Sequence, residues 1–285
     1  MKEHASRLFA DDFVFLEAPR WHSGRLWVPD VFDSILYALD ADGRRSVVHA
    51  GLPPRPNSIG FLPDGTLIVV SSVSKQLLKL VGGKLQLHAD LSGHAAGDLN
   101  DFVIDGSGRI YSGNFGYDLF GGAPLASTNI HRVEADGTVS VAAGGLEFPN
   151  GAVITGDGRT LVVAETWAGR LTAFDRDAAG HLSNPRTYAD LGKRQPDGIC
   201  VDAEDGIWVS SFSTGEVIRV FEGGRITDRI AFRGSAVACQ LGGEDGHTLF
   251  CTTYDGTIAD QQQRLRRGAI HTVRVDVPRA PAVPR

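Results

Sequence analysis

One pattern recurs six times along the chain: a polar residue, a short apolar strand, a turn containing glycine, and a second apolar strand. The turns are anchored by Gly24, Gly65, Gly108, Gly158, Gly206 and Gly246. These glycines are 41, 43, 50, 48 and 40 residues apart. A period of about 40–50 residues, with about four short strands in each unit, is the signature of a β-propeller blade. The repeat predicts an all-β fold, a single six-bladed β-propeller over residues 1–285 with four antiparallel strands per blade.

The ends of the chain and two insertions fall outside the repeat. Residues 7–16 are expected to supply a strand that closes the ring with the sixth unit, because closure leaves only short, protected strand edges. Residues 278–285 contain three prolines, and we expect them to form a flexible tail. The insertions cover 113–124 and 255–267. Long loops on a rigid scaffold often carry binding residues, so the first is a candidate pocket wall. The alternative is that both are plain surface excursions.

Composition narrows the classes of partner. The net charge is −6 and no run of basic residues occurs, which argues against nucleic acid. No apolar run approaches the roughly 18–20 residues of a membrane helix, and the first residues lack the apolar core of a signal peptide. Cys200, Cys239 and Cys251 have no CxxC spacing, so we expect buried thiols in a reducing compartment. The expectation is a cytoplasmic monomer or small homo-oligomer that acts on a small molecule and contacts neither nucleic acid nor membrane.

In five of the six units, an oxygen-bearing side chain stands where the first apolar strand begins. These residues are Glu17, Asn57, Asn100, Asn150 and Asp197, whereas the sixth unit has only alanine and valine there. The first strand of each propeller blade lines the central channel, so these side chains should converge at one end of it. Carboxylate and amide oxygens without His or Cys suit a hard divalent cation such as calcium, magnesium or manganese, with zinc as another choice. The alternative is that the Pro-Asn and Pro-Asp pairs only make hydrogen bonds in turns.

Four short motifs resemble those of the senescence marker protein (regucalcin)/gluconolactonase family of six-bladed β-propeller lactonases. They are Glu17-Ala18-Pro19-Arg20-Trp21, Leu99-Asn100-Asp101, Pro149-Asn150-Gly151 and Pro196-Asp197-Gly198. Their order and spacing extend the resemblance over nearly the whole chain. It implies one divalent metal ion in the central channel, with calcium expected first and zinc, manganese, magnesium or iron(II) as alternatives. It also implies that Glu17, Asn150 and Asp197 are the protein ligands of that metal.

The same resemblance implies substrate contacts around the metal. Asn100 would touch the substrate or a metal-bound water, and another substrate position falls at or near Asp118. Sugar lactonases of the family commonly carry an arginine two residues before this asparagine, where this chain has Asp98. A carboxylate cannot donate the hydrogen bonds that a guanidinium offers a sugar, so both a sugar lactone and another small cyclic ester stay open as substrates. The remaining candidate substrate contacts and pocket walls are Asn57, Trp167, Phe115, Tyr117 and Phe120.

The ring of polar residues and the resemblance together predict a lactonase, a gluconolactonase-like carboxylic ester hydrolase that uses a metal-activated water. A cation held by three side chains keeps positions free to polarise a carbonyl and to hold water. Asp197 is the expected general base, and Asp101 is the alternative. Two other functions stay open. One is hydrolysis of a non-sugar ester or phosphotriester on the same scaffold, and the other is a non-catalytic, metal-containing propeller that binds a ligand.

Overall fold

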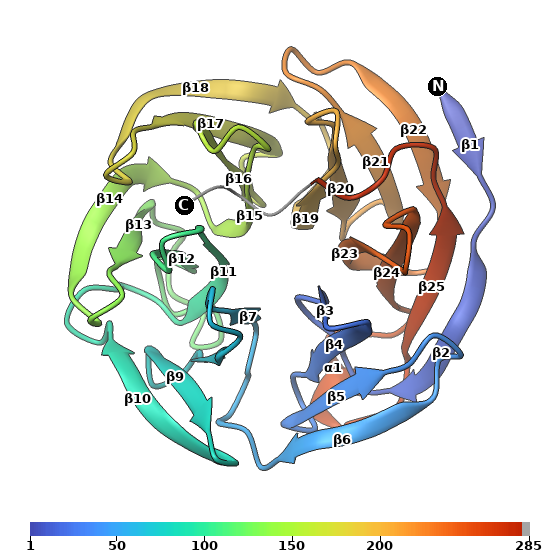
Figure 1. The fold of residues 1–285 in the computed structure, drawn as a ribbon, viewed down its shortest axis with the longest axis horizontal. Coiled ribbons are helices and arrows are strands. Elements are labelled where there is room, and N and C mark those ends of the chain that lie inside the picture. Colours follow the sequence, from blue (N-terminus) through green and yellow to red (C-terminus); the bar gives the residue numbers. More distant parts are fainter. Residues whose placement is uncertain (281–285) are drawn as a thin grey trace.

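The computed structural model describes residues 1–280 and confirms the six-bladed propeller. Six sheets are arranged radially around a central channel, as Figure 1 shows. Each sheet contains four antiparallel strands that follow one another from the channel outward, and one sheet carries a fifth strand at its outer edge. Within the described residues the only helix is α1 (Ile258–Gln262).

The first three blades follow the chain from the channel to the outside. Blade 1 consists of β3 (Arg20–His22), β4 (Arg25–Asp30), β5 (Ile35–Leu39) and β6 (Arg45–Ala50). Blade 2 consists of β7 (Ile59–Phe61), β8 (Leu67–Ser71), β9 (Gln76–Val81) and β10 (Lys84–Asp90). Blade 3 consists of β11 (Leu99–Ile104), β12 (Ile110–Asn114), β13 (Thr128–Val133) and β14 (Val139–Leu146).

The last three blades repeat this order, and the N-terminal strands complete two of them. Blade 4 consists of β15 (Pro149–Ile154), β16 (Thr160–Glu165), β17 (Arg170–Arg176) and β18 (Leu182–Asp190). Blade 5 consists of β19 (Pro196–Val201), β20 (Ile207–Ser211), β21 (Glu216–Val220), β22 (Ile226–Ala231) and β1 (Lys2–His4). Blade 6 consists of β23 (Ser235–Gly242), β24 (Thr248–Tyr254), β25 (Gly268–Arg274) and β2 (Arg7–Phe13).

The glycines that anchor the repeat lie in the turns that follow the innermost strands. All of them have a positive φ except Gly206, where Asp205 takes the left-handed conformation instead (φ 58°). A Cβ on Gly206 would lie 2.5 Å from Nε of Arg219. That guanidinium forms a buried ion pair with Asp202 (2.6 Å), so close approach requires the glycine at this turn.

The N-terminal segment closes the ring, as predicted, and it does so on two blades. β2 pairs antiparallel with β25, with Arg7 opposite Thr272. β1 pairs in parallel with β22 of the neighbouring blade, a contact that the repeat did not predict. His4 anchors this short strand, because its Nε2 lies 2.7 Å from Oδ1 of Asp228. Figure 1 shows the N-terminal strands along the outside of blades 5 and 6.

Apolar side chains fill the spaces between neighbouring blades. The cluster between blades 5 and 6 includes Trp208 and Cys239, which are almost fully buried. The innermost strands approach one another closely, since a Cβ on Gly198 of β19 would lie 2.4 Å from the Cβ of Ala238 in β23. All three cysteines are buried and free, as the sequence predicted.

The second insertion and the C-terminal segment contain more regular structure than expected. In the insertion, Thr257 and Asp260 form a capping box that begins α1. The predicted flexible tail does not begin at residue 278. The carbonyl of Pro278 accepts a hydrogen bond from the N–H of Ala203 (2.9 Å), and the N–H of Arg279 donates to blade 6. The backbone groups of residues 278–280 thus bond to blades 5 and 6, and residues 281–285 of the predicted tail lie outside the described part. No described helix is long and apolar enough to cross a membrane.

Candidate active site

The five oxygen-bearing residues of the repeat lie at the starts of the innermost strands. Asn100, Asn150 and Asp197 are the second residues of β11, β15 and β19. Asn57 and Glu17 lie in the loops just before β7 and β3. Glu17 is half-buried and the other four are buried. Because the innermost strands of a propeller start at the same end of the channel, all five belong to one end of it.

Two of the ring asparagines connect their own blade to the next one. Asn57 Nδ2 donates a hydrogen bond to the carbonyl of Leu99 (3.3 Å), and Asn100 Nδ2 donates to the carbonyl of Pro149 (3.2 Å). Each acceptor is at the start of the neighbouring innermost strand. The amide nitrogens therefore join blades, which is different from the local turn bonds considered as an alternative. The amide oxygens do not share these bonds and remain acceptors.

Asn150 makes the same kind of connection through a hydroxyl group. Its Nδ2 donates to Oγ1 of Thr166 (3.2 Å), and that hydroxyl donates to the carbonyl of Pro196 (2.8 Å). Pro196 is the first residue of β19, immediately before Asp197. The orientation of the Asn150 amide is thereby fixed, and its oxygen is left as an acceptor.

Two carboxyl groups share this end of the channel. Burial raises the pKa of Asp197 to about 8, although a hydrogen bond with Asn150 opposes the shift and the charge of Asp101 adds to it. Burial likewise raises the pKa of Glu17 well above its ordinary value, and the charges of Asp197 and Asp101 raise it further. Asp197 Oδ1 is buried and has no hydrogen-bond partner among residues 1–280. A cation would bind the unpaired oxygen of Asp197 and would offset the negative charge of the neighbouring carboxyl groups.

An ion pair lies next to these carboxyl groups within the channel. Arg20 Nη2 lies 2.6 Å from Asp101 Oδ1 and also donates to the carbonyl of Phe102 (3.1 Å). Asp101 Oδ1 accepts further hydrogen bonds from Ser58 Oγ (2.5 Å) and from the N–H of Phe102 (2.7 Å). Three donors therefore occupy this oxygen, while Oδ1 of Asp197 has none. The contrast favours Asp197 over Asp101 as a proton acceptor.

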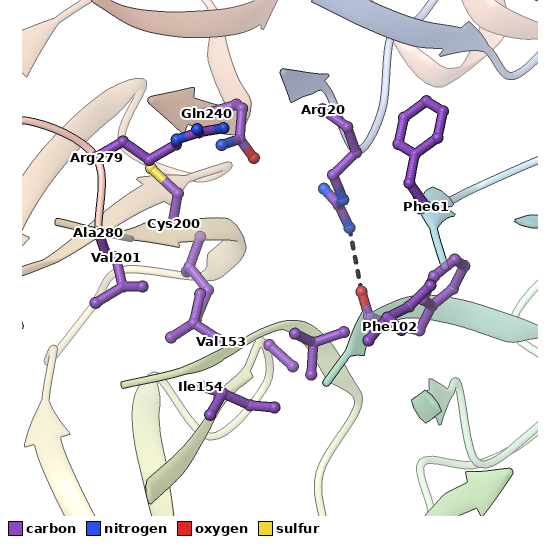
Figure 2. A pocket seen from close by; sticks show the side chains of 15 residues that line it. Arg20, Phe61, Phe102, Val153, Ile154, Cys200, Val201, Gln240, Arg279 and Ala280 are labelled. Carbon is purple, nitrogen blue, oxygen red and sulfur yellow. Dashed lines mark hydrogen bonds between the residues drawn. The ribbon is translucent and has the colours of Figure 1, made fainter. Parts of the chain in front are cut away.

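A separate cavity of about 290 Å³ opens on the other side of Arg20. It is lined by later residues of the innermost strands, such as Ile104 and Ile154, and by Arg279, which follows the last strand of the chain. None of the five ring residues lines it. Figure 2 shows Arg20 extending toward the carbonyl of Phe102 at the top of this cavity. Arg20 thus lines the cavity and also pairs with Asp101, which lies next to the ring residue Asn100 in β11.

Aromatic side chains border the ring on the side of blades 3 and 4. Phe115 stacks on Phe148 with ring centroids 4.6 Å apart, and Phe148 lies 5.1 Å from Trp167. Trp167 Nε1 donates to the hydroxyl of Tyr117 (2.8 Å), and Phe120 lies 6.2 Å from Phe115. We call these five residues the aromatic arc. The structure brings together the four pocket walls proposed from the sequence and adds Phe148 to them.

The two acidic residues proposed as substrate contacts at this rim both bind other parts of the chain. Asp98 Oδ2 lies 2.6 Å from Nη2 of Arg55, and both side chains are half-buried. Asp118 is exposed, and its Oδ1 accepts a hydrogen bond from the N–H of Gly121 (2.7 Å). Asp98 is therefore part of an ion pair at the rim, and Asp118 helps to fold the first insertion.

Besides Phe148, three residues of the site were not among the sequence candidates. Arg20 stands inside one of the quoted motifs, but nothing in the sequence pairs it with Asp101. Arg55 stands two residues before Asn57, as Phe148 does before Asn150, so the repeat alignment could have identified it. Thr166 follows β16, and no sequence pattern marks it.

Two carboxyl groups and one amide, from Glu17, Asp197 and Asn150, are the side chains that fit a divalent cation here. No group of three or more His, Cys, Asp or Glu side chains within residues 1–280 is placed to hold a metal. The ring is consistent with that finding because it combines two acidic side chains with neutral amides. Oxygen ligands of this kind suit calcium in particular.

Comparison with known proteins identifies the relatives of this chain. The sequence model of the SMP-30/gluconolactonase/LRE-like region matches residues 15–255. Regucalcin from Danio rerio is 28% identical over 159 residues, which cover 54% of this chain and 53% of that protein. A pentonolactonase from Haloferax volcanii is 28% identical over 161 residues, covering 55% of this chain and 53% of that protein. The chain thus spans about half the length of these curated relatives.

Solved structures show the same fold over a longer range. A calcium-binding protein, regucalcin, from Agrobacterium tumefaciens superposes with a TM-score of 0.82, 22% identity, and coverage of 100% of this chain and 99% of the other. A gluconolactonase from Xanthomonas campestris superposes with a TM-score of 0.78, 23% identity, and coverage of 95% and 89%. At these identities the superpositions establish the propeller fold alone.

Proposed function

Because the chain belongs to the SMP-30/gluconolactonase/LRE-like family, we propose that it is a metal-dependent lactonase that hydrolyses a small cyclic ester to its hydroxy acid. One observation carries the proposal. Asp197 Oδ1 is buried and has no hydrogen-bond partner in the described part of the chain, and both Glu17 and Asn150 lie next to this carboxyl group. The names of two similar proteins, a pentonolactonase and a gluconolactonase, support the substrate class.

Glu17, Asn150 and Asp197 would hold the metal, and calcium is the first expectation. The ligands are oxygens, and one similar structure is described as a calcium-binding protein. A bound divalent cation supplies Lewis-acid polarisation of the lactone carbonyl, lowers the pKa of water, and returns Asp197 to its ionised form. Zinc, manganese, magnesium and iron(II) are the alternatives to be compared in reconstitution.

The side chains of the ring can carry the proton movements of hydrolysis. The Asp197 carboxylate, through the oxygen that does not hold the cation, would accept a proton from the attacking water while the water oxygen bonds to the carbonyl carbon of the lactone. The bond between that carbon and the ring oxygen then breaks, and the proton passes to the departing ring oxygen to give a hydroxy acid. Asn100 can contact the substrate through its Oδ1, because its Nδ2 is bound to Pro149.

Replacement of the proposed ligands tests this function. Asp197→Asn removes the negative charge and Asn150→Ala removes the amide oxygen, so each variant should lose the metal. Each should also lose turnover by more than the roughly 10²–10⁴-fold typical of a lone acid–base group, because binding and activation fail together. The measurements are metal content after reconstitution and hydrolysis rates on sugar, aliphatic and aromatic lactones.

Asp245→Asn is a matched control, since Asp245 pairs with Arg274 (2.5 Å) on an exposed turn far from the ring. It should keep both metal and activity. Full lactonase activity in metal-stripped Asp197→Asn would refute the proposal. A wild-type protein that binds metal tightly but turns over neither lactones nor phosphotriesters would support the non-catalytic alternative instead.

A further inference from the structure

Arg55 stands at one end of the aromatic arc, in the loop before β7. Its guanidinium carbon lies 4.0 Å above the ring centroid of Phe120, within the range of a cation–π interaction. Its Nη2 lies 2.6 Å from Asp98 Oδ2, and the two side chains are 22% and 21% exposed. Two independent contacts therefore hold the guanidinium at the rim, although the side chain is accessible to solvent.

The backbone places Arg55 in the same position as Phe148 of the arc. Both residues precede a Pro-Asn pair, Pro56-Asn57 and Pro149-Asn150. Both also have a φ of 56°, a conformation that non-glycine residues seldom adopt. Such conformations persist where the surrounding structure requires them, often at functional sites. Two blades thus use one strained corner to set a large side chain beside their ring asparagine.

Arg55 keeps hydrogen-bonding capacity beyond its ion pair. A guanidinium has five N–H groups, and one carboxylate can take at most two of them in a fork. At least three N–H groups are left for a ligand. Asp98 also neutralises the arginine, so this corner has donors without a net positive charge. The Arg55–Asp98 pair therefore adds hydrogen-bond donors to this rim without adding a net charge that would attract an anionic substrate.

The arc itself offers apolar surface to a ligand. Phe120 is 54% exposed and Trp167 is 38% exposed, at opposite ends of a row that continues through buried Phe115 and Phe148. Exposed aromatic side chains that join a buried aromatic cluster commonly mark a binding surface. The Tyr117 hydroxyl accepts the Trp167 N–H, so the arc has few polar atoms to match the hydroxyl groups of a sugar.

We propose that Arg55 is a substrate-positioning residue, and that the site prefers an uncharged lactone whose body is a flat aromatic or apolar ring. The ring lies along the aromatic arc, and Arg55 donates to an oxygen of the substrate. This deepens the proposed lactonase function and rests on it. It also gives Asp98 a role, which is to hold Arg55 in place.

The test compares an aromatic lactone, dihydrocoumarin, with a polyhydroxylated one, glucono-δ-lactone, on the metal-reconstituted enzyme. Wild type should have a higher kcat/KM for dihydrocoumarin than for glucono-δ-lactone. Arg55→Met should raise the KM for dihydrocoumarin about tenfold or more, as expected for the loss of a hydrogen bond to a charged group, with little change in kcat. The KM of Arg55→Lys for dihydrocoumarin should lie between those of wild type and Arg55→Met, because an ammonium keeps the charge without the planar fork.

Arg225→Met is the matched control, since Arg225 is exposed and stacks on Phe221 (4.4 Å) away from the ring. Its kinetic constants should equal those of wild type. An Arg55→Met enzyme with unchanged KM, or a wild-type preference for glucono-δ-lactone, would overturn the proposal.

Calorimetric titration with 3,4-dihydroquinolin-2-one, the lactam that corresponds to dihydrocoumarin, measures ligand binding at the rim independently of catalysis. Wild type should bind the lactam, and Arg55→Met should bind it about tenfold more weakly. Absence of lactam binding by folded, metal-loaded wild type overturns the inference about the rim. Lactam binding without turnover of any lactone would instead refute the lactonase function and leave the rim assignment standing.

Discussion

Individual side chains of the ring serve the fold with one atom and the candidate site with another. Asn100 is the clearest case, because its Nδ2 is bound to the carbonyl of Pro149 while its Oδ1 remains an acceptor. An aspartate there would lose the donor and set a carboxylate against a carbonyl oxygen. The amide at this position is therefore explained by blade-to-blade bonding, independently of the substrate contact proposed for it.

A different residue, Tyr188, should control the response of stability to alkaline pH. Its hydroxyl donates to the carbonyl of Asp205 (3.2 Å), and burial together with the charge of Glu222 raises its pKa to about 12. A raised pKa in the folded state means that stability is complete below the unfolded value of about 10 and is lost as the pH rises toward 12. After allowance for solvent screening the loss is up to about 2 kcal/mol.

Urea unfolding at pH 9 and at pH 11.5 measures this effect. Wild type should lose more stability between the two pH values than Tyr188→Phe, which has no group to titrate there. Equal losses in the two proteins would show that Tyr188 does not contribute. Tyr188→Phe should be slightly less stable at pH 9, because the hydrogen bond to Asp205 is gone.

The identity of the ring residues could be predicted from the sequence, but several of their partners could not. Asn57, Asn100, Asn150 and Asp197 stand in register with the turn glycines, and register is a local property of the repeat. The pairing of Arg55 with Asp98 joins two blades and depends on side-chain reach across the fold. No spacing along one unit encodes such a contact.

Among the structural elements, the innermost strands depend on glycine for a reason other than turn formation. Asn-Gly and Asp-Gly pairs usually indicate hairpin turns, yet Gly151 and Gly198 lie inside β15 and β19. A Cβ on Gly151 would lie 2.6 Å from the backbone oxygen of Asp197. The missing side chains allow adjacent strands to approach, and this approach brings the ring residues close together.

Gly198→Ala tests the importance of this approach. The added methyl group would meet the Cα and Cβ of Ala238 at 2.7 and 2.4 Å, where backbone has to move. The variant should lose about 1–3 kcal/mol of unfolding free energy, the usual cost of overpacking, and lactone turnover should fall with it. Gly93→Ala is the control, since nothing lies within 4 Å of a Cβ there. Equal urea midpoints for the two variants would contradict the prediction.

Most strands could be predicted because alternating apolar residues and turn glycines are local signals. The exceptions are elements whose existence depends on distant parts of the chain. β1 has only three residues and is stabilised by pairing with β22. α1 has only five residues in a polar, Gln-rich stretch, so it shows no helical stripe. Residues 278–280 likewise follow blades 5 and 6 through backbone bonds that proline content does not reveal.

For the whole molecule, the N-terminal segment determines whether the ring is closed. β2 is the outer strand of blade 6, and Phe13 at its end is completely buried. Deletion of residues 1–13 should therefore cost at least about 3–5 kcal/mol, the typical loss for one large buried aromatic side chain, and should lower the melting temperature markedly. Deletion of residues 1–5 removes β1 alone and should have a smaller effect.

Differential scanning calorimetry of the two truncated proteins and the full chain gives the comparison. The full chain should have the highest melting temperature, the protein lacking residues 1–5 a lower one, and the protein lacking residues 1–13 the lowest. If the protein lacking residues 1–13 melted at the same temperature as the full chain, closure by β2 would not contribute to stability.

The pairing of β2 with β25 also has a consequence for synthesis on the ribosome. Arg7 is synthesised 265 residues before its partner Thr272. β2 must therefore wait, unpaired, while five blades emerge and fold in turn, and it can join blade 6 only after β25 has been synthesised. During that interval the nascent chain carries an open strand edge at each end, the state in which β-proteins are most prone to associate with one another.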